Sequence, residues 1–252
     1  MDDAKSARAA SMIRGAQHVT VFTGAGISVE SGIPPFRGDE GLWARYDPQC
    51  LDISFFHAYP TQAWENIREI FYDFMGKARP NAAHLDLARL EKKGMVKAVI
   101  TQNIDNLHSE AGSRNLCEYH GTIRTLTCTG CGHEIPAAGV SLEHLPPRCA
   151  LCGSVLKPDF VFFGELISED AARFAIEQTH LADVMLVVGT TGEVMPACLI
   201  PQLAKENGCT IVEVNTCPSA YTTTITDVFL QGRATQVLDR LVRDIDRIKE
   251  KD

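Results

Sequence analysis

The stretch Val19-Thr-Val-Phe-Thr-Gly-Ala-Gly-Ile-Ser-Val-Glu-Ser-Gly-Ile-Pro-Pro-Phe-Arg37 decides the fold of this chain. An apolar, β-branched run from Val19 to Thr23 breaks abruptly into Gly24-Ala-Gly26 and then into Ile27-Ser-Val-Glu30. This order predicts a buried strand, a tight turn and the first turn of a helix. Glycines let the backbone approach a ligand closely, and a helix start offers unpaired N–H groups to a phosphate. We therefore expect a pyrophosphate-binding turn directly after the first strand.

The residues after this turn add a second feature. The usual dinucleotide-binding pattern has a third glycine at its sixth position, where this chain has Val29, so the turn alone is a weak signal. A segment rich in Gly and Pro follows over residues 31–38 and cannot continue a helix. It carries Phe36 and Arg37, an aromatic ring and a permanent cation. We expect this loop to act as a clamp beside the phosphate site.

Size and composition narrow the class of protein. With 252 residues, 45% of them hydrophobic, the chain can bury one large core with room for a small insert. Its net charge of −8 argues against a nucleic-acid surface and suits the binding of basic peptides. The N-terminus lacks the apolar core of a signal peptide, and no apolar run is long enough for a membrane span. Nine cysteines, an odd number, are poor material for a disulfide framework. We expect a cytoplasmic protein that contacts neither nucleic acid nor membrane.

Three more apolar runs complete a predicted sheet: Val96–Thr101, Val184–Val188 and Thr210–Asn215. Runs of this kind suit strands buried on both faces. Helices are expected over residues 5–15, 61–75 and 80–94, from Ser168 onward and over 237–248. Strands that alternate with helices indicate right-handed crossovers and a parallel, Rossmann-like α/β sheet with helices on both faces.

Polar residues follow the predicted strands, where an open parallel sheet forms its ligand crevice. Gln102-Asn-Ile-Asp105 comes directly after the second strand, and its amides and carboxylate suit a carboxamide or ribose hydroxyls. Asn103 or Asp105 can equally well cap the next helix. His120, followed by glycine, is on its own no more than a structural histidine.

Four cysteines form the strongest single motif in the chain. Seventeen residues separate Cys128-Thr-Gly-Cys131 from Cys149-Ala-Leu-Cys152, a spacing typical of zinc sites. Four sulfur ligands leave no open position on the metal, so the zinc is expected to be structural. A redox pair and a nucleic-acid ribbon are the alternatives. Residues 121–158 contain only Arg124, Arg148 and Lys157 against Glu134 and Glu143, which makes no basic stripe and argues against the ribbon.

Taken together, these features resemble the sirtuins, the NAD-dependent protein deacylases. The motifs that carry the resemblance are Gly24-Ala-Gly-Ile-Ser28, Phe36-Arg37, Gln102-Asn-Ile-Asp105, His120-Gly121, the four cysteines, Val161-Phe-Phe-Gly-Glu165, Gly189-Thr-Thr191, Val214-Asn215 and Gly232-Arg-Ala234. They stand in family order and span nearly the whole chain.

The resemblance implies a division into three parts. Residues 1–35, 95–123 and 159–252 would form a Rossmann-like NAD-binding domain. Residues 36–94 would form a helical insert with the cofactor loop, and 124–158 a zinc-ribbon module. A protein or peptide carrying an acyl-lysine would bind between them, and the protein is expected to be a monomer.

It also implies roles for particular residues. NAD would be bound by Gly24, Ala25, Gly26, Ser28, Phe36, Arg37, Gln102, Asn103, Ile104, Asp105, Gly189, Thr190, Thr191, Asn215 and Ala234. The catalytic residues would be His120, Asn103 and Asp105, with His120 as the base that activates a ribose hydroxyl. The substrate would be contacted by Tyr72, Val161, Phe163 and Gly164. Zinc would be held by Cys128, Cys131, Cys149 and Cys152.

The activity that the resemblance implies is removal of acyl groups, acetyl above all, from lysine. The products would be nicotinamide, O-acyl-ADP-ribose and free lysine. A sirtuin-type mono-ADP-ribosyltransferase would use the same NAD site. An NAD oxidoreductase is opposed by Val29, and a non-enzymatic zinc-ribbon module by the acidic charge and by His120 and Asp105.

The chain departs from the family pattern at three places. Sirtuins that remove succinyl or malonyl groups carry a Tyr-x-x-Arg pair, and here Met75 stands in place of the arginine after Tyr72. Arg68, four residues before Tyr72 on the same face of the expected helix, is a candidate substitute, which would make the protein a desuccinylase or demalonylase. Glu193 stands where many relatives have an apolar residue. Thr235-Gln236 follows Ala234 where Gly-Glu is common.

Overall fold

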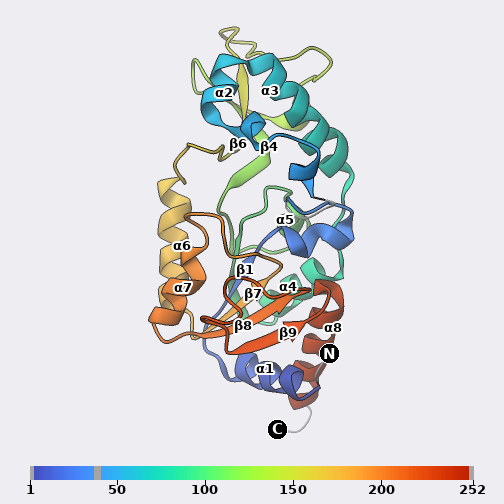
Figure 1. The fold of residues 1–252 in the computed structure, drawn as a ribbon, viewed down its shortest axis with the longest axis vertical. Coiled ribbons are helices and arrows are strands. Elements are labelled where there is room, and N and C mark those ends of the chain that lie inside the picture. Colours follow the sequence, from blue (N-terminus) through green and yellow to red (C-terminus); the bar gives the residue numbers. More distant parts are fainter. Residues whose placement is uncertain (1–2, 37–40, 250–252) are drawn as a thin grey trace.

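The large sheet lies at one end of an elongated molecule and a smaller sheet lies toward the other end (Figure 1). The computed structural model describes residues 3–36 and 41–249. Six parallel strands form the large sheet in the order β3 (Leu116–Glu118), β2 (Val96–Thr101), β1 (Val19–Thr23), β7 (Val184–Val188), β8 (Thr210–Asn215) and β9 (Val228–Gln231). The four long apolar runs form the four central strands, as predicted. The edge strands β3 and β9 were not predicted, because runs of three and four residues are too short to show a pattern.

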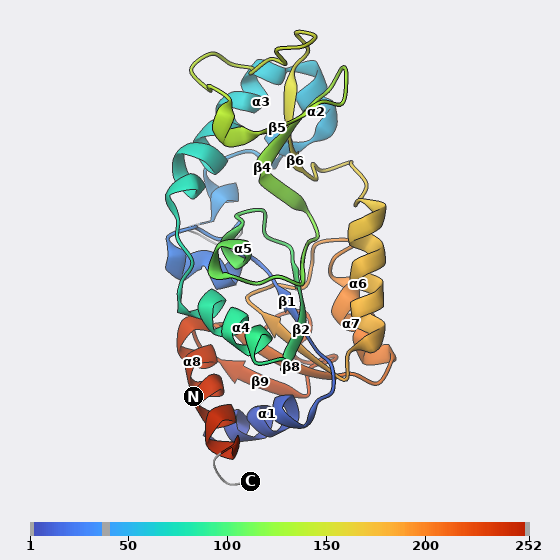
Figure 2. The same ribbon diagram turned by 180° about the vertical axis from the view of Figure 1, so that it is seen from behind.

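Helices cover both faces of this sheet, as the alternation of strands and helices predicts (Figures 1 and 2). One face is covered by α1 (Asp3–Gly15), α4 (Ala82–Lys92) and α8 (Ala234–Lys249), and the other by α6 (Glu169–Leu181) and α7 (Leu199–Glu206). Every residue of β1 and β7 is buried. Alternate side chains of β1 therefore enter different cores: Val21 belongs to the core that includes Leu241 of α8, while Phe22 belongs to the core that includes Ala204 of α7.

Helix α4 belongs to the core of the large sheet, although the sequence places it within the 36–94 insert. Ala83, Leu87 and Leu90 are fully buried against the sheet and α8. This packing favours grouping α4 with the large sheet, and the expected division at residue 94 stays a prediction. The reason is the helical spacing of these three residues, which directs one apolar stripe to the large core. The helix begins with a capping box between Asn81 and His84.

The small sheet is antiparallel and shares an apolar core with the preceding helices. Its order is β5 (Glu134–Pro136), β4 (Gly121–Cys128) and β6 (Leu156–Phe160). The helices α2 (Ile53–Ala58) and α3 (Pro60–Ile67) pack against it, and Trp64 of α3 donates from Nε1 to the carbonyl of Leu156 at 2.8 Å. The helical insert and the ribbon thus stabilise each other through one core.

The expected helix over 61–75 changes its winding in the middle. α3 ends at Ile67, a π-helical turn, η4, covers Arg68–Phe74, and a short 3₁₀ turn, η5, covers Met75–Lys77. The apolar spacing does not distinguish these forms, because α- and π-turns bury similar faces over so short a distance. The wider turn brings residues five apart together, and the Nε of Arg68 lies 3.6 Å from a carboxylate oxygen of Asp73.

The segment after Gly24 is also tighter than predicted. Ala25–Ser31 forms a 3₁₀ helix, η1, and not an α-helix, and it ends at Gly32, whose φ is 89°. Within the described residues, no helix is long and apolar enough to cross a membrane.

Candidate functional site

Two glycine turns meet where the strand order reverses, between β1 and β7. Gly24 follows β1 and donates its amide to the carbonyl of Val188 at 3.0 Å, and Gly26 donates to the carbonyl of Gly189 at 2.8 Å. A Cβ atom on Gly26 would lie 2.7 Å from the Cα of Gly189, so no side chain fits at this position. Such a reversal point at the carboxyl ends of the strands is where open parallel sheets bind ligands.

A buried polar network lies next to this turn, at the end of β2. The Ser28 hydroxyl donates to the carboxylate of Asp105 at 2.6 Å, and the Asn103 amide donates to Ser28 Oγ at 3.1 Å. The second carboxylate oxygen of Asp105 accepts from the amide of Leu107 at 3.0 Å. Burial raises the pKa of Asp105, and these hydrogen bonds oppose that rise. The network holds an amide and a carboxylate in fixed positions in the crevice.

Asp105 also interacts with the start of the following helix, α5 (Leu107–Ala111), through this bond to Leu107. Asp105 therefore also serves the start of the next helix, which was the alternative expected from the sequence. The side-chain amide of Asn103 instead donates to the carbonyl of Gly24 at 3.3 Å. Ile104 is buried beside them.

A second group of polar residues connects β2, β7 and β8 across the crevice. The Gln102 amide donates to Thr190 Oγ1 at 3.1 Å, and the Asn215 amide donates to the carbonyl of Thr190 at 2.9 Å. Thr191 follows Thr190, and its carbonyl accepts from the amide of Ala220 at 3.0 Å. Gln102, Thr190 and Asn215 are therefore brought together, as expected from their places after the strands.

His120 is held by one ring nitrogen and leaves the other available. It follows β3, and its Nδ1 lies 3.0 Å from the carbonyl oxygen of Gln102, so Nδ1 carries the proton and donates. The tautomer this requires leaves a lone pair on Nε2. Burial lowers the pKa of His120, and the bond to Gln102 opposes that change. The ring is therefore neutral near pH 7 and can accept a proton.

Two other histidines lie behind the network. The backbone amide of Asn81 donates to Nδ1 of His84, and Nε2 of His84 lies 3.4 Å from Ser28 Oγ. Burial lowers the pKa of His84 to about 4. The His84 ring meets that of His108 at 4.9 Å, and Nε2 of His108 lies 3.0 Å from Thr23 Oγ1. His108 was not assigned a role from the sequence, because a histidine inside a short helix carries no signal of burial.

Aromatic rings connect the cofactor loop with the segment after β6. Phe36 and Trp43 have ring centroids 5.3 Å apart, and Trp43 and Phe163 have centroids 6.3 Å apart. Trp43 was not assigned a role from the sequence. Arg37, expected beside Phe36, lies outside the described residues.

The segment Val161–Gly164 is tied to two neighbours through its backbone. Val161 donates its amide to the carbonyl of His120, and both backbone groups of Phe163 are paired with residues 51 and 53. Neither the carbonyl of Val161 nor the amide of Gly164 has a hydrogen-bond partner among the described residues. The backbone at these two positions can therefore still form hydrogen bonds with an added strand.

Tyr72 and Met75 lie in the small core. Tyr72 stacks on Trp64 and donates its hydroxyl to the carbonyl of Ile123 at 3.1 Å. Met75 is buried among apolar residues. Arg68 points elsewhere: its guanidinium donates to the carbonyl of Leu142 at 3.3 Å and approaches Asp73.

Thr235, another of the three departures, has a partner in η1. Its hydroxyl donates to a carboxylate oxygen of Glu30 at 2.8 Å, and its amide donates to the same oxygen at 3.2 Å. This bond ties the start of α8, including buried Ala234, to η1.

Four cysteines meet at the far end of the small sheet. The sulfur atoms of Cys128, Cys131, Cys149 and Cys152 all lie within 4.8 Å of one another. Zinc–sulfur bonds of about 2.3 Å in a tetrahedron place sulfur atoms about 3.8 Å apart, so the geometry fits one zinc ion. Cys128 and Cys149 are buried, and within the described residues the cluster consists of these four cysteines, which suits a structural metal.

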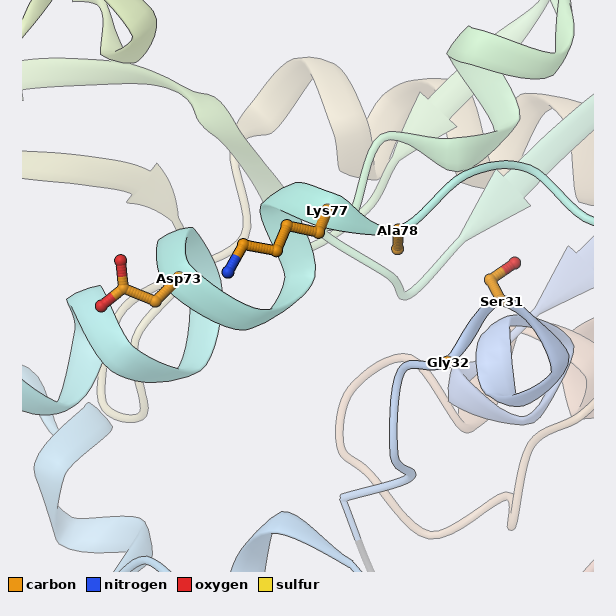
Figure 3. Close-up of a pocket in the computed structure, with 5 residues that line it drawn as sticks. All are labelled: Ser31, Gly32, Asp73, Lys77 and Ala78. Atoms are coloured by element: carbon orange, nitrogen blue, oxygen red, sulfur yellow. The ribbon is translucent and has the colours of Figure 1, made fainter.

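One open hollow of about 350 Å³ lies between the end of η1 and the π-helical segment (Figure 3). Its described lining consists of Ser31, Gly32, Asp73, Lys77 and Ala78. None of these residues is among those expected to bind NAD or substrate.

Comparisons with known proteins find relatives that match nearly the whole chain. The "NAD-dependent protein deacylase 2" of Pyrobaculum aerophilum is 46% identical over 242 residues, which cover 94% of this chain and 95% of that protein. A solved Sir2 homologue mutant in complex with ADP-ribose superposes with a TM-score of 0.93 at 36% identity, covering 100% of this chain and 99% of that one. A Sir2 mutant with a deacetylated p53 peptide and 3′-O-acetyl ADP-ribose gives a TM-score of 0.89 at 34% identity, covering 93% of this chain and 96% of that one.

The family comparison covers the site itself. The Sir2 family profile matches residues 24–196, which include the glycine turn, the Asn103–Asp105 network, His120 and the four cysteines. With this match and a relative of 46% identity along nearly its full length, the chain belongs to the Sir2 family.

Proposed function

We propose that this protein is an NAD-dependent protein-lysine deacylase that favours acetyl and other apolar acyl groups. The observation that carries the proposal is that three groups meet at the carboxyl ends of the strands. These are the Gly24–Gly26 turn, the Ser28–Asn103–Asp105 network and the neutral ring of His120. Similar proteins are named for NAD-dependent deacylation and deacetylation, and this supports the same function.

The residues at the crevice suit NAD in chemical type. The close-packed glycine turn and the amide of Ala25, which has no hydrogen-bond partner among the described residues, suit the pyrophosphate, with Arg37 as the expected cation. The amide and carboxylate of Asn103 and Asp105 complement a carboxamide such as that of nicotinamide. Thr190, Thr191 and Asn215 would hold the adenosine side. NAD, when bound, supplies a ribose–nicotinamide bond at which the acyl oxygen of the substrate can displace nicotinamide.

His120 would act as the base in the reaction. Its Nδ1 proton is committed to the Gln102 carbonyl, so Nε2 is the nitrogen that accepts a proton from a ribose hydroxyl. Burial keeps the ring neutral, which is the form that a base requires. Phe36 would cover the reacting ribose and exclude water, because water there would compete with the acyl oxygen.

The substrate would bind by adding a strand to the segment after β6. The free carbonyl of Val161 and amide of Gly164 can pair with an extended peptide, main chain to main chain. Such binding reads little of the peptide sequence, so the acyl group and its pocket would decide much of the selectivity.

Binding of a succinyl group needs a cation in the acyl pocket to pair with the distal carboxylate. At that position this pocket would be apolar. Met75 offers neither charge nor hydrogen-bond donor. Arg68 is engaged by Leu142 and Asp73, and this supports acetyl over succinyl. A carboxylate without its cation there loses a bond of about 1.5–3 kcal/mol.

We also propose a division of the chain that follows the two cores. Residues 1–35, 80–123 and 159–252 would form the NAD-binding domain, because α4 packs on the large sheet. Residues 36–79 and 124–158 would form the helical and zinc-ribbon parts. The protein would act as a monomer in the cytoplasm on proteins that carry acyl-lysine.

Replacing His120 with Ala is expected to lower kcat for deacylation about 10²–10⁴-fold, because a positioned base contributes that much. The measurement is steady-state release of free lysine peptide, with circular dichroism as the check on folding. Exchange of labelled nicotinamide into NAD should survive better than deacylation, since it does not need the base. Near-normal deacylation by the variant would show that His120 is not the base.

The pH dependence follows from the lowered pKa of His120. The neutral form is the active one, so the rate is full above the pKa and falls as the pH drops through it. Because burial lowers this pKa, the acid limb of kcat/KM should have its midpoint below about 6.5, the ordinary histidine value. A midpoint clearly above 7 would contradict the assignment.

Replacing Cys149 with Ser is expected to remove zinc and loosen the small sheet, because a closed four-sulfur site couples metal binding to folding. Elemental analysis should find about one zinc per chain in the wild type and much less in the variant. Cys209→Ser is the matched control, since Cys209 lies beside β8 and outside the cysteine cluster. Full activity after complete removal of zinc would overturn the structural role.

Replacing Met75 with Arg should shift selectivity toward succinyl-lysine by about tenfold or more, because it restores a charge-assisted bond. The measurement is kcat/KM for acetyl and succinyl versions of one peptide. Arg68→Met is the control and should leave the ratio of the wild type unchanged. A wild-type preference for succinyl that Arg68→Met abolishes would show that Arg68 reads the carboxylate.

A further inference from the structure

Glu213 is a fully buried carboxylate in the middle of β8. It is 1% exposed, and its neighbours across the sheet are Val187 of β7 and Phe229 of β9. No Lys, Arg or His side chain pairs with it within the described parts of the chain. Burying a carboxylate without a cation is costly. Burying an apolar side chain on this face, where Ile211 is packed, would cost less free energy than burying a carboxylate.

Three hydroxyl groups offset the cost of burial. Ser219 donates to Oε1 of Glu213 at 2.5 Å, Thr222 lies 3.0 and 2.8 Å from the two carboxylate oxygens, and Thr226 donates to Oε2 at 2.7 Å. All three come from one segment, residues 216–227, which connects β8 with β9 without a helix. Hydrogen bonds to an ionised carboxylate are stronger than neutral ones. One side chain thus fixes the path of the whole connection.

This connection supports the turn after β7. The amide of Ala220 donates to the carbonyl of Thr191 at 3.0 Å. The ring of Tyr221 lies directly against Gly192, where a Cβ atom would be 2.8 Å from ring carbons. The Tyr221 hydroxyl donates to the carbonyl of Cys198 at 2.9 Å. The position of Thr190–Gly192 therefore depends on a segment that is ordered by Glu213.

We propose that Glu213 is a positioning residue for the adenosine side of NAD. The inference rests on the proposed function, in which Thr190, Thr191 and Asn215 hold that side. Glu213 does not touch the ligand. It orders residues 216–227, and these hold the Thr191 carbonyl and the Gly192 turn in place.

The proposal predicts a selective loss of affinity in Glu213→Leu. This variant keeps an apolar side chain of similar size but leaves three hydroxyls without their acceptor. KM for NAD and Kd for ADP-ribose are expected to rise together, by about tenfold, which corresponds to about 1.4 kcal/mol. The inhibition constant of nicotinamide and KM for the acetyl peptide should change less than about twofold, and kcat at saturating NAD should remain. Glu213→Gln, which retains one carbonyl acceptor, should restore most of the affinity.

Two further variants keep the test decisive. Thr222→Val removes the contacts to both carboxylate oxygens without changing β8, and should raise Kd for ADP-ribose by about threefold even if Glu213→Leu does not fold. Thr224→Ala is the control in the same segment, because among the described residues the Thr224 hydroxyl bonds only the backbone carbonyls of Ala220 and Tyr221.

The outcomes separate the possible failures. If the wild type neither binds NAD nor deacylates the peptide, the proposed function fails. If the wild type does both, and Thr222→Val and any folded Glu213→Leu bind ADP-ribose as tightly as Thr224→Ala, the inference fails alone. A melting temperature that falls while KM for NAD stays at the wild-type value would equally overturn it, because Glu213 would then serve the fold only.

Discussion

The amide of Gly26 donates to the carbonyl of Gly189, and through this bond the ends of β1 and β7 lie against each other. Any side chain at Gly26 would collide with the backbone of Gly189, whose own φ is 64°. This close approach at the reversal of strand order has two consequences. It places η1, and with it Ser28, above the end of β2. It also brings Thr190 within reach of Gln102.

Buried polar groups are the second constraint on the site. Asp105, Ser28, Asn103 and His84 lie in a region with little access to water, where each unpaired group would cost free energy. The hydrogen bonds among them offset that cost and at the same time fix every side chain in one arrangement. A site of this kind is rigid before the ligand arrives, which is what orientation of two substrates requires. The two apolar cores on either side of the sheet supply the stability that it needs.

Much of this arrangement could be predicted from the sequence. The four central strands are long apolar runs because both of their faces are buried, and polar residues directly after them mark the crevice. The cysteine spacing likewise corresponds to one compact cluster. Each of these signals lies within a short stretch of the chain and can therefore be recognised from the sequence.

The features that were missed depend on contacts between distant segments. The π-helical turn at Arg68 looks like an ordinary helix in its apolar spacing. The apolar stripe of α4 can be seen in the sequence, but its partners, β2 and α8, cannot. The positions of Trp43 and His108 depend on contacts with residues far away in the chain. Glu213 sits inside an apolar run, and the hydroxyls that satisfy it come from the next connection. No pattern within a single segment could have revealed these partners.

The central claim is that His120 and the crevice transfer the acyl group of lysine to the ribose of NAD. Mass spectrometry of the products, with one acetyl-lysine peptide and NAD in excess, tests this most directly. The account predicts equal amounts of nicotinamide, unmodified lysine peptide and O-acetyl-ADP-ribose. A peptide that keeps its acetyl group and gains the mass of ADP-ribose, with no O-acetyl-ADP-ribose formed, would contradict it.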